Sequence, residues 1–439
     1  MYAEFGGGRA GQGPLTWGQQ GIWEAMGRNP PGHFNIGRVL MVPRRGGVEA
    51  VEAARAVGRL VERHEALRTR VVVTGEPRQV VSAAGRIPLR VVEAEPGGDT
   101  AAEMLAEIAA EEFDHAVEWP IRVGLVTSGG RVRWVVLVLS HLAADGHATE
   151  IVVRDMRRLL RQGSIGGPSP AQPLDLAYDQ RARGARRTSG AVAFWTGQYE
   201  RLPPATFTPD YPGRGHRRLR LTSETLAVAV DRLAARHQVS SSTVLLAATA
   251  ALVGARTGNA AVALSTVVGN RFSNGLREMV TTLDQLGLFV LDLDGGPSLD
   301  ELVPRAWRAA LTAYRHAYYE QPELDRALAR LGEDRGAELN PYGCFNDVRR
   351  AASAPKPSPN VPKATDTQNV HNGSADKNSR LDRLPAPEGL RCRFCLLVLD
   401  HEEDTGAVVL QLTADTRCLP PEQVEGFLPE LENLVLAAA

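Results

Sequence analysis

The spacing of apolar and polar residues predicts a mixed fold in which amphipathic helices alternate with buried strands. Apolar residues return every three or four positions along several stretches, whereas shorter apolar runs are bounded by turn residues. Helices are expected at 47–65, 99–115, 149–160, 175–199, 226–237, 239–252, 302–319 and 421–436. Strands are expected at 67–73, 79–83, 89–92, 120–126, 131–139, 262–268, 286–293, 395–400 and 407–413.

Length and composition divide these elements between two lobes. A chain of 439 residues is long for one domain, and a loop rich in Gly, Pro and Ser covers 161–173. We expect lobes at 1–185 and 186–439. The stretch 351–380 has no Phe, Trp, Tyr, Leu, Ile or Met and buries too little surface to offset its ordering entropy. We therefore expect a mobile loop at about 351–385, a passive insertion rather than a lid or docking element.

The candidate chemistry lies where the apolar run 134–139 ends in Ser140-His141. A histidine after a strand buried on both faces can be held by packing, with its imidazole facing a cleft. Histidine is the side chain best suited to proton transfer near neutral pH. Asp145 and Gly146 follow about one turn later, in the pattern His-x-x-x-Asp-Gly. For the bare pattern, a packed strand-end histidine with a capping aspartate is the simpler interpretation.

Charge and cysteine content exclude several functions. The formal net charge is -1, so nothing points to nucleic acid or an anionic membrane. No run of about 18 apolar residues predicts a transmembrane helix, and the N-terminus lacks the regions of a secretory signal, so we expect a cytoplasmic protein. Cys392-x-x-Cys395 has no second half of a zinc site, so we expect packed, reduced thiols and no metal.

Several segments, taken in order, carry a family resemblance. They are Leu-Thr-Trp-Gly-Gln-Gln-Gly-Ile-Trp at 15–23, Phe-Asn-Ile at 34–36, Arg-His-Glu-Ala-Leu-Arg-Thr-Arg at 63–70, His141 to Gly146, Asp-Leu-Ala-Tyr at 175–178, Val-Gly-Asn-Arg at 268–271, and Leu-Gly-Leu-Phe-Val at 286–290. Together they resemble the condensation domains of nonribosomal peptide synthetases. That family has the α/β (α+β) fold of chloramphenicol acetyltransferase. The resemblance implies two such lobes in a V-shaped pseudo-dimer with a tunnel between them.

The resemblance also assigns roles to residues. His141 matches the family's proton-handling histidine, and Asp145 matches an aspartate that pairs with an arginine, here Arg271. Gly146 fits a place where the backbone approaches the reacting centre. Ser140 departs from the family, which has a first histidine there, and Leu291 replaces an asparagine.

Substrate-tunnel positions are also suggested for Leu291, Trp17 and His147. For Trp17 a core role and for His147 a surface or capping role are the simpler interpretations. His64 is expected at a helix C-terminus, and Arg68 and Arg70 are expected in solvent or ion pairs.

The implied function is that of a stand-alone condensation enzyme, expected as a monomer, in nonribosomal peptide or hybrid natural-product biosynthesis. It would transfer an acyl or aminoacyl group from a carrier-protein thioester to an amine or hydroxyl acceptor, which is a small molecule or is itself carrier-bound. No cofactor is expected to be bound, because the partner carrier supplies the phosphopantetheine. Two alternatives stay open: a coenzyme A-dependent acyltransferase of this fold, and a catalytically degenerate domain that recruits partner proteins.

Overall fold

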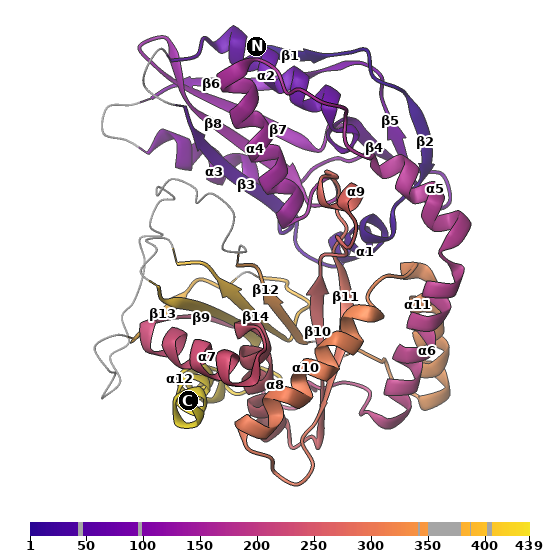
Figure 1. Ribbon diagram of the computed structural model, residues 1–439, viewed down its shortest axis with the longest axis vertical. Helices are drawn as coiled ribbons and strands as arrows, with labels where there is room; N and C mark the ends of the chain where they lie inside the picture. Colours follow the sequence, from indigo (N-terminus) through magenta and orange to yellow (C-terminus); the bar gives the residue numbers. More distant parts are fainter. Residues whose placement is uncertain (43–46, 95–98, 341–342, 350–378, 387, 402–405) are drawn as a thin grey trace. The chain divides into compact units, whose positions relative to one another are not determined.

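The computed structural model describes residues 1–42, 47–94, 99–340, 343–349, 379–386, 388–401 and 406–439. Contacts divide these residues into two compact units (Figure 1). Unit 1 contains Met1–Arg186 and Gly269–Gln285, and unit 2 contains Arg187–Val268 and the described residues after Gln285. The expected boundary at 185/186 therefore falls one residue from the observed one, but the segment 269–285 was expected in the second lobe and belongs to unit 1.

Unit 1 is built on a five-stranded sheet in the order β1-β6-β7-β8-β3 and a three-stranded sheet in the order β2-β5-β4. The larger sheet consists of β1 (Tyr2–Phe5), β6 (Gly85–Glu93), β7 (Ile121–Ser128), β8 (Arg131–Ser140) and β3 (Asn35–Met41). The smaller one consists of β2 (Gly11–Pro14), β5 (Pro77–Val81) and β4 (Thr69–Val73). The helical elements of unit 1 are α1 (Trp17–Met26), α2 (Ala50–Arg63), η1 (Glu65–Arg68), α3 (Thr100–Ala110), α4 (Gly146–Gln162), α5 (Pro173–Arg183) and α9 (Asn274–Arg277), together with the first residues of α6 (Ala185–Arg201).

Strand β8 is buried on both faces, which explains its continuous apolar run. Leu137 and its odd-numbered neighbours pack with α2 and α4, whereas Val136 and Val138 pack with α3. The strand pairs with β7 on one side and β3 on the other. Because both faces and both edges are covered, the end of β8 is a rigid point from which the next residue, His141, projects.

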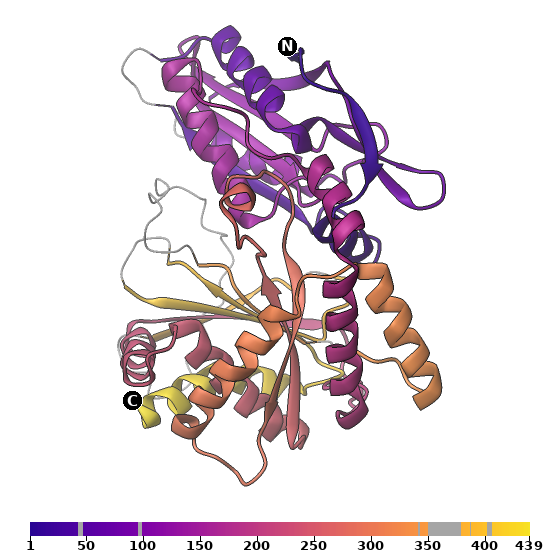
Figure 2. The ribbon, with the colours of Figure 1, turned by 45° about the vertical axis from the view of Figure 1, so that its right-hand side comes forward.

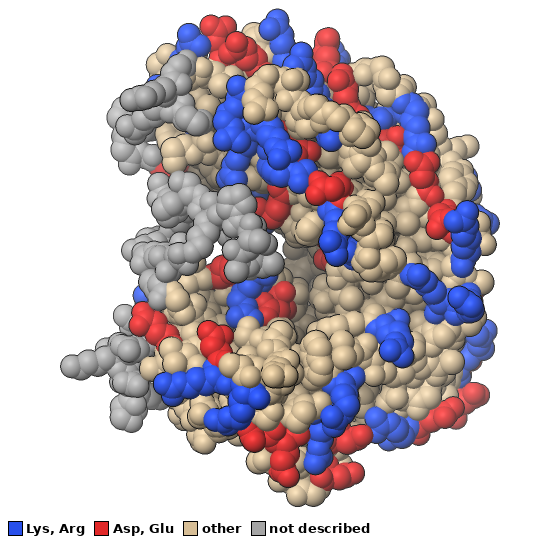
Figure 3. Space-filling view, in the orientation of Figure 1, with Lys and Arg blue, Asp and Glu red and all other residues tan. Residues whose placement is uncertain are grey.

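The helices that cover β8 are amphipathic, with arginines on their outer sides. Helix α2 carries Arg55 and Arg59, and α4 carries Arg157, Arg158 and Arg161, at three- and four-residue spacing. Figure 3 shows Lys and Arg side chains gathered over these two helices. The spacing that buries the apolar sides thus leaves one basic surface on unit 1.

Unit 2 is built on a seven-stranded sheet in the order β11-β10-β12-β14-β15-β9-β13. Its strands are β11 (Gln285–Asp292), β10 (Ala261–Val268), β12 (Gly343–Asp347), β14 (Phe394–Leu399), β15 (Val408–Asp415), β9 (His216–Ser223) and β13 (Ser379–Leu384). Helices α7 (Glu224–His237), α8 (Ser241–Thr257), α10 (Leu299–Arg315) and α12 (Pro421–Ala438) share its main core. Helices α6 and α11 (Gln321–Arg335) lie side by side and share a second core with β10 and β11 (Figure 2).

Two sequence expectations need correction in unit 2. Most of the expected loop at 351–385 lies outside the described residues, but 379–384 forms strand β13, because it pairs along its whole length with β9. Cys392 and Cys395, expected as reduced thiols, form a disulfide, with Cα atoms 6.3 Å apart, within the range that such a bond spans.

Among the described residues, none of the helices is by itself long and apolar enough to span a membrane. Helices α7 and α8 reach the required length and apolar composition only when taken together, and the chain bends by 104° between them.

A buried polar cluster joins α2 to α4. The side chain of Asp155, 1% exposed, lies 3.0 Å from His64 Nε2 and 2.9 Å from Arg154 Nε. Burial lowers the pKa of His64 more than Asp155 raises it, so the ring is neutral and its Nε2–H donates to the carboxylate. Although its own burial acts in the opposite direction, hydrogen bonds from His64 and Arg154 lower the pKa of Asp155 to about 2.

Replacing Asp155 by Ala should therefore lower the free energy of unfolding by about 2–3 kcal/mol at pH 7, because the buried His64 N–H loses its acceptor. The folded-state pKa of Asp155 is depressed, so its contribution is present above the unfolded pKa of about 4 and is lost as the pH falls towards 2. Urea denaturation from pH 8 down to pH 3 measures both effects. Asp179→Ala, which breaks an exposed ion pair with Arg183, is the matched control and should cost less than about 0.5 kcal/mol. If Asp155→Ala lowers the free energy of unfolding by no more than Asp179→Ala does, this account is contradicted.

Candidate functional site

His141 is the first residue after β8, and its backbone is fixed on both sides. Its N–H donates to Phe34 O at 3.0 Å, and the Phe34 ring lies edge-on to the imidazole at 6.0 Å. The side chain is half-buried. The imidazole is thus held in unit 1 by the end of a rigid strand, as the sequence predicted for a strand-end histidine.

Hydrogen bonds on one side of the ring assign its proton. The Thr282 hydroxyl donates its single hydrogen to the carbonyl oxygen of His141. The hydroxyl oxygen of Thr282, Oγ1, also lies 3.2 Å from His141 Nδ1. Since Thr282 has no second hydrogen to give, Oγ1 accepts, and Nδ1 carries the proton. In a neutral ring Nε2 is then unprotonated, and no described residue forms a hydrogen bond with it.

Burial also favours the neutral ring. Desolvation lowers the pKa of His141 below its usual value, and the hydrogen bond to its own backbone and the charge of Asp145 act in the opposite direction. The ring is therefore a neutral imidazole near pH 7, with a lone pair on Nε2 available to accept a proton.

Asp145 is fully buried and joins two segments of unit 1. It is the N-cap of α4, where its Oδ1 accepts from Ala148 N at 2.7 Å. Its Oδ2 accepts from Leu283 N at 3.0 Å. Helix α4 consequently begins at Gly146, three residues before the predicted start at 149.

Arg271 forms the ion pair with Asp145 that the resemblance implied. Its Nη2 lies 2.7 and 2.8 Å from the two carboxylate oxygens, and the Arg271 side chain is 8% exposed. The same guanidinium donates to the carbonyls of Leu276, Met279 and Thr281. One side chain thereby organises the segment that carries Thr282.

Two further side chains complete this cluster. Burial and the negative charge of Asp145 raise the pKa of Asp284 well above its usual value, against the effect of Arg271. Asn270 has a left-handed backbone with φ of 51°, and its side chain donates to Leu283 O at 3.1 Å. The Asn270 contact ties the turn around Arg271 to Leu283.

The first sequence motif supports the site through helix α1. Thr16 and Gln19 form a capping box at the helix start, and Gln19 Nε2 donates to Leu142 O at 3.4 Å. A Cβ on Gly18 would lie 2.4 Å from the Thr282 carbonyl oxygen. Glycine at this position therefore allows the Thr282 segment to approach the helix.

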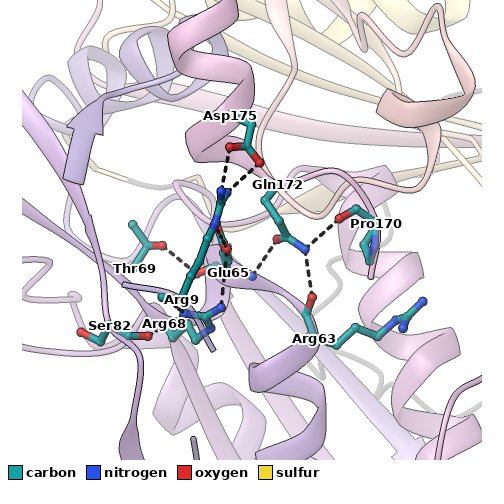
Figure 4. Close-up of polar contacts among 9 residues, drawn as sticks. All are labelled: Arg9, Arg63, Glu65, Arg68, Thr69, Ser82, Pro170, Gln172 and Asp175. Carbon is teal, nitrogen blue, oxygen red and sulfur yellow. Dashed lines mark hydrogen bonds and ion pairs between the residues drawn. The ribbon is translucent and has the colours of Figure 1, made fainter. Parts of the chain in front are cut away.

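The second motif, Arg63 to Arg70, is a structural junction (Figure 4). Arg9 donates to both carboxylate oxygens of Glu65 and to both of Asp175 on α5. Gln172 also connects to this junction by accepting from Glu65 N at 3.0 Å. Three segments of unit 1 that are far apart in sequence are thus joined at Glu65.

The structure confirms two expectations for this second motif and corrects one. His64 is the C-cap of α2, as expected at a helix C-terminus, and is buried against Asp155. Arg68 forms an ion pair with Glu65 at 3.6 Å, and it is buried and also donates to the carbonyls of Arg9 and Ser82. Arg70 stacks its guanidinium over the Trp119 ring, 3.9 Å from the centroid.

Of the three candidate tunnel residues, Trp17 and Leu291 are buried within their own units, whereas His147 is exposed. Trp17 is 3% exposed and its ring packs beside Gly184, and Leu291 is 2% exposed in the main core of unit 2. Apolar packing within its own unit accounts for each residue, and a place in a tunnel wall stays a prediction. His147 is exposed, and its Nε2 bonds to Arg277 O at 2.9 Å, which fits the surface role.

Gly146 and Ser140 complete the predicted set. A Cβ on Gly146 would meet no described atom within 4 Å, so no described neighbour requires glycine there. Ser140 is fully buried, and its Oγ lies 2.7 Å from His115 Nε2.

The arrangement supplies a proton acceptor. Sequence reasoning missed Thr282, Asp284 and His115, although Thr282 and Asp284 lie between the motifs at 268–271 and 286–290. Among the described residues, no group of three or more His, Cys, Asp or Glu side chains could hold a metal ion.

Comparisons with known proteins agree with the motifs. Residues 10–342 match the sequence profile of the family described as Condensation domain. The chain is 30% identical over 328 residues to the nonribosomal peptide synthetase CymA of Salinispora arenicola, covering 69% of this chain and 4% of that protein. It is 27% identical over 352 residues to the phosphinothricin tripeptide synthetase PhsB of Streptomyces viridochromogenes, covering 75% of this chain and 29% of PhsB. The chain thus spans a small part of these relatives.

Solved structures share the fold over nearly the whole chain. SgcC5 of Streptomyces globisporus has a TM-score of 0.69 at 20% identity, with 97% of this chain and 98% of SgcC5 covered. A condensation domain that mediates chain release from the enacyloxin polyketide synthase has a TM-score of 0.73 at 18% identity, with 96% and 82% covered. At these identities the likeness establishes the chloramphenicol acetyltransferase-like fold. With its profile match over residues 10–342 of 439, this chain belongs to the condensation-domain family.

Proposed function

We propose that this chain transfers an acyl or aminoacyl group from a carrier-protein thioester to an amine or hydroxyl acceptor, with His141 as the proton acceptor. The family acts in nonribosomal peptide and polyketide natural-product biosynthesis by acyl transfer. The observation that supports the role of His141 is the ring itself: Nδ1 is held by Thr282, and Nε2 is free of described partners. The V-shaped arrangement of lobes, the tunnel and the monomeric state stay predictions.

The reaction follows from this tautomer. The acceptor nitrogen attacks the thioester carbonyl carbon, and its proton passes to Nε2 of His141. The tetrahedral intermediate collapses, the carbon–sulfur bond breaks, and the proton is passed to the departing sulfur, which leaves amide and thiol. An unprotonated Nε2 cannot donate to the oxyanion before it has accepted this proton, so the base role precedes any role as a donor.

The proposed acyl transfer depends mainly on how the protein positions the donor and the acceptor. A thioester is already activated, and holding two reactants in line can lower the barrier by about 7–11 kcal/mol. A positioned general base contributes about 10²–10⁴-fold. The phosphopantetheine arm would arrive with the carrier, so that the chain needs no resident cofactor.

The first test replaces His141 by Ala. Purified carrier proteins loaded with a panel of acyl and aminoacyl groups are mixed with amine acceptors, and products are followed by mass spectrometry. We expect His141→Ala to lower kcat by about 10²–10⁴-fold. His237→Ala, on α7 of unit 2 and paired with Asp300, is the control and should keep wild-type turnover. Full turnover by His141→Ala would contradict the base assignment.

The same panel separates the alternatives. We expect turnover of acyl-carrier and none of the same acyl group on coenzyme A at equal concentration. Turnover of acyl-coenzyme A alone would identify a coenzyme A-dependent acyltransferase. Carrier binding without turnover of any loaded group would favour a degenerate recruiting domain.

The pH dependence of kcat/KM should show one acid limb from His141. Because burial lowers the pKa of the ring, the neutral form that accepts a proton persists below pH 6.5, and activity falls only as the pH drops through that lowered value. The rate should be flat from pH 7 to 8 with an acceptor that titrates outside this range. An apparent pKa above 7 would contradict the assignment.

The ion pair should affect stability and turnover together. Asp145→Asn leaves the buried Arg271 guanidinium without its counter-charge, and we expect a loss of about 3–5 kcal/mol in the free energy of unfolding. Arg271→Lys keeps the charge but cannot reach the carbonyls of Leu276, Met279 and Thr281 together, and should also lower kcat. Urea denaturation and kcat are the measurements. If Asp145→Asn keeps wild-type stability while losing turnover, its role is chemical rather than structural.

A further inference from the structure

Ser140 occupies the position before His141 where related motifs have another histidine, and its hydroxyl has two partners. Its Oγ lies 2.7 Å from His115 Nε2 and accepts from Leu142 N at 3.2 Å. Ser140 is completely buried. These two contacts span His141, since Leu142 is the residue that follows it.

The direction of the Ser140–His115 hydrogen bond can be assigned. Ser140 Oγ already accepts from the Leu142 N–H, so its single hydrogen is free to point at His115. Burial lowers the pKa of His115 and keeps its ring neutral. The charge of Arg122 also lowers this pKa, whereas the charges of Asp114 and Glu118 raise it. The backbone of Phe113 raises the pKa of His115, as a carbonyl that accepts from the ring does, so we assign the ring hydrogen to Nδ1 and leave Nε2 as the acceptor. The hydroxyl therefore donates to His115.

His115 is itself held in place. Its carbonyl accepts from Val71 N at 2.8 Å, which attaches the loop before β7 to strand β4. The rings of Trp23 and Phe113 each lie 6.0 Å from the His115 ring, centroid to centroid. The imidazole is thus a fixed acceptor that selects one rotamer of Ser140.

We propose that His115 is a positioning residue for His141: through the Ser140 hydroxyl it fixes the backbone on both sides of His141. The carbonyl of Ser140 adds to this anchor by accepting from Ala143 N and Ala144 N. The inference rests on the proposed function of His141 as the proton acceptor.

The packing predicts a reciprocal requirement. An imidazole at position 140 would have to enter a fully buried site beside the His115 ring, so Ser140→His alone should be overpacked. Removing the ring from His115 creates the space that the new side chain needs. The two positions should therefore tolerate an exchange of imidazole and hydroxyl better than a second imidazole.

The first experiment measures kcat and KM for a carrier-bound donor accepted by wild type. His115→Phe keeps a ring but loses the acceptor, and we expect kcat to fall about 10–100-fold with KM nearly unchanged. His115→Gln, whose amide oxygen can accept from Ser140, should stay within about threefold of wild type. Ser140→Ala should resemble His115→Phe, and the double variant should lose no more than either single one.

The second experiment tests the exchange. Ser140→His/His115→Ser should recover at least about threefold in kcat over Ser140→His alone. Hydrogen exchange of the Leu142 amide reports on the same contact without turnover. It should accelerate in His115→Phe and Ser140→Ala but not in His115→Gln, by more than the loss of global stability read from the urea midpoint accounts for.

The outcomes separate this inference from the proposed function. If His141→Ala is inactive and both His115→Phe and the Leu142 amide behave like wild type, the positioning role is wrong and the proposed function stands. If His141→Ala stays active, the proposed function fails, and hydrogen exchange alone decides whether His115 anchors Ser140. Additive losses in the double variant would show that the two side chains act separately, which overturns the proposal.

Discussion

The ion pair of Asp145 with Arg271 is the interaction on which the site depends. Asp145 caps helix α4 and also accepts from Leu283, while Arg271 gathers three backbone carbonyls of the segment that contains Thr282. This explains why residues 269–285, which connect two strands of the unit 2 sheet, belong with unit 1. Without the pair, the segment that holds the Thr282 hydroxyl against His141 loses four of its hydrogen bonds to Arg271 and Asp145, and the tautomer of the ring is less firmly determined.

Three separate constraints determine the position, tautomer and charge of the His141 ring. Strand β8 provides rigidity by burial on both faces, the Thr282 hydroxyl fixes the proton on Nδ1, and desolvation keeps the ring neutral. Each of these has a cost, because burying polar groups is unfavourable unless their hydrogen bonds are satisfied. The carboxylate of Asp145 and the Thr282 hydroxyl are satisfied. By contrast, Arg271 Nε and Thr281 Oγ1 are buried without a hydrogen-bond partner among the described residues, and Nε2 of His141 is left to accept a proton. For a reaction whose donor is already activated, a single available lone pair in a fixed place is a sufficient contribution from the protein.

Sequence periodicity was informative where structure is local. The strand pair at 120–139, the helix at 226–237 and the burial of β8 on both faces follow from apolar spacing alone. Helix α11 was not predicted, because its apolar stripe is narrow in a charged segment. Strand β13 was not predicted either, since its polar sequence is ordered by pairing with β9. The family resemblance supplied the Asp145–Arg271 pair, which lies 126 residues apart in sequence and has no local signal. Thr282 and His115 carry no pattern, because their roles arise only from contacts across the fold.

The measurement that tests the central claim most directly is ¹⁵N NMR of the imidazole of His141, assigned by its absence in His141→Ala. At pH 7 we predict a protonated Nδ1 and an unprotonated Nε2, with the ring becoming cationic only at a pH below 6.5. In Thr282→Val, which removes the hydroxyl, the preference for this tautomer should weaken. A proton on Nε2, or a cationic ring at pH 7, would contradict the account.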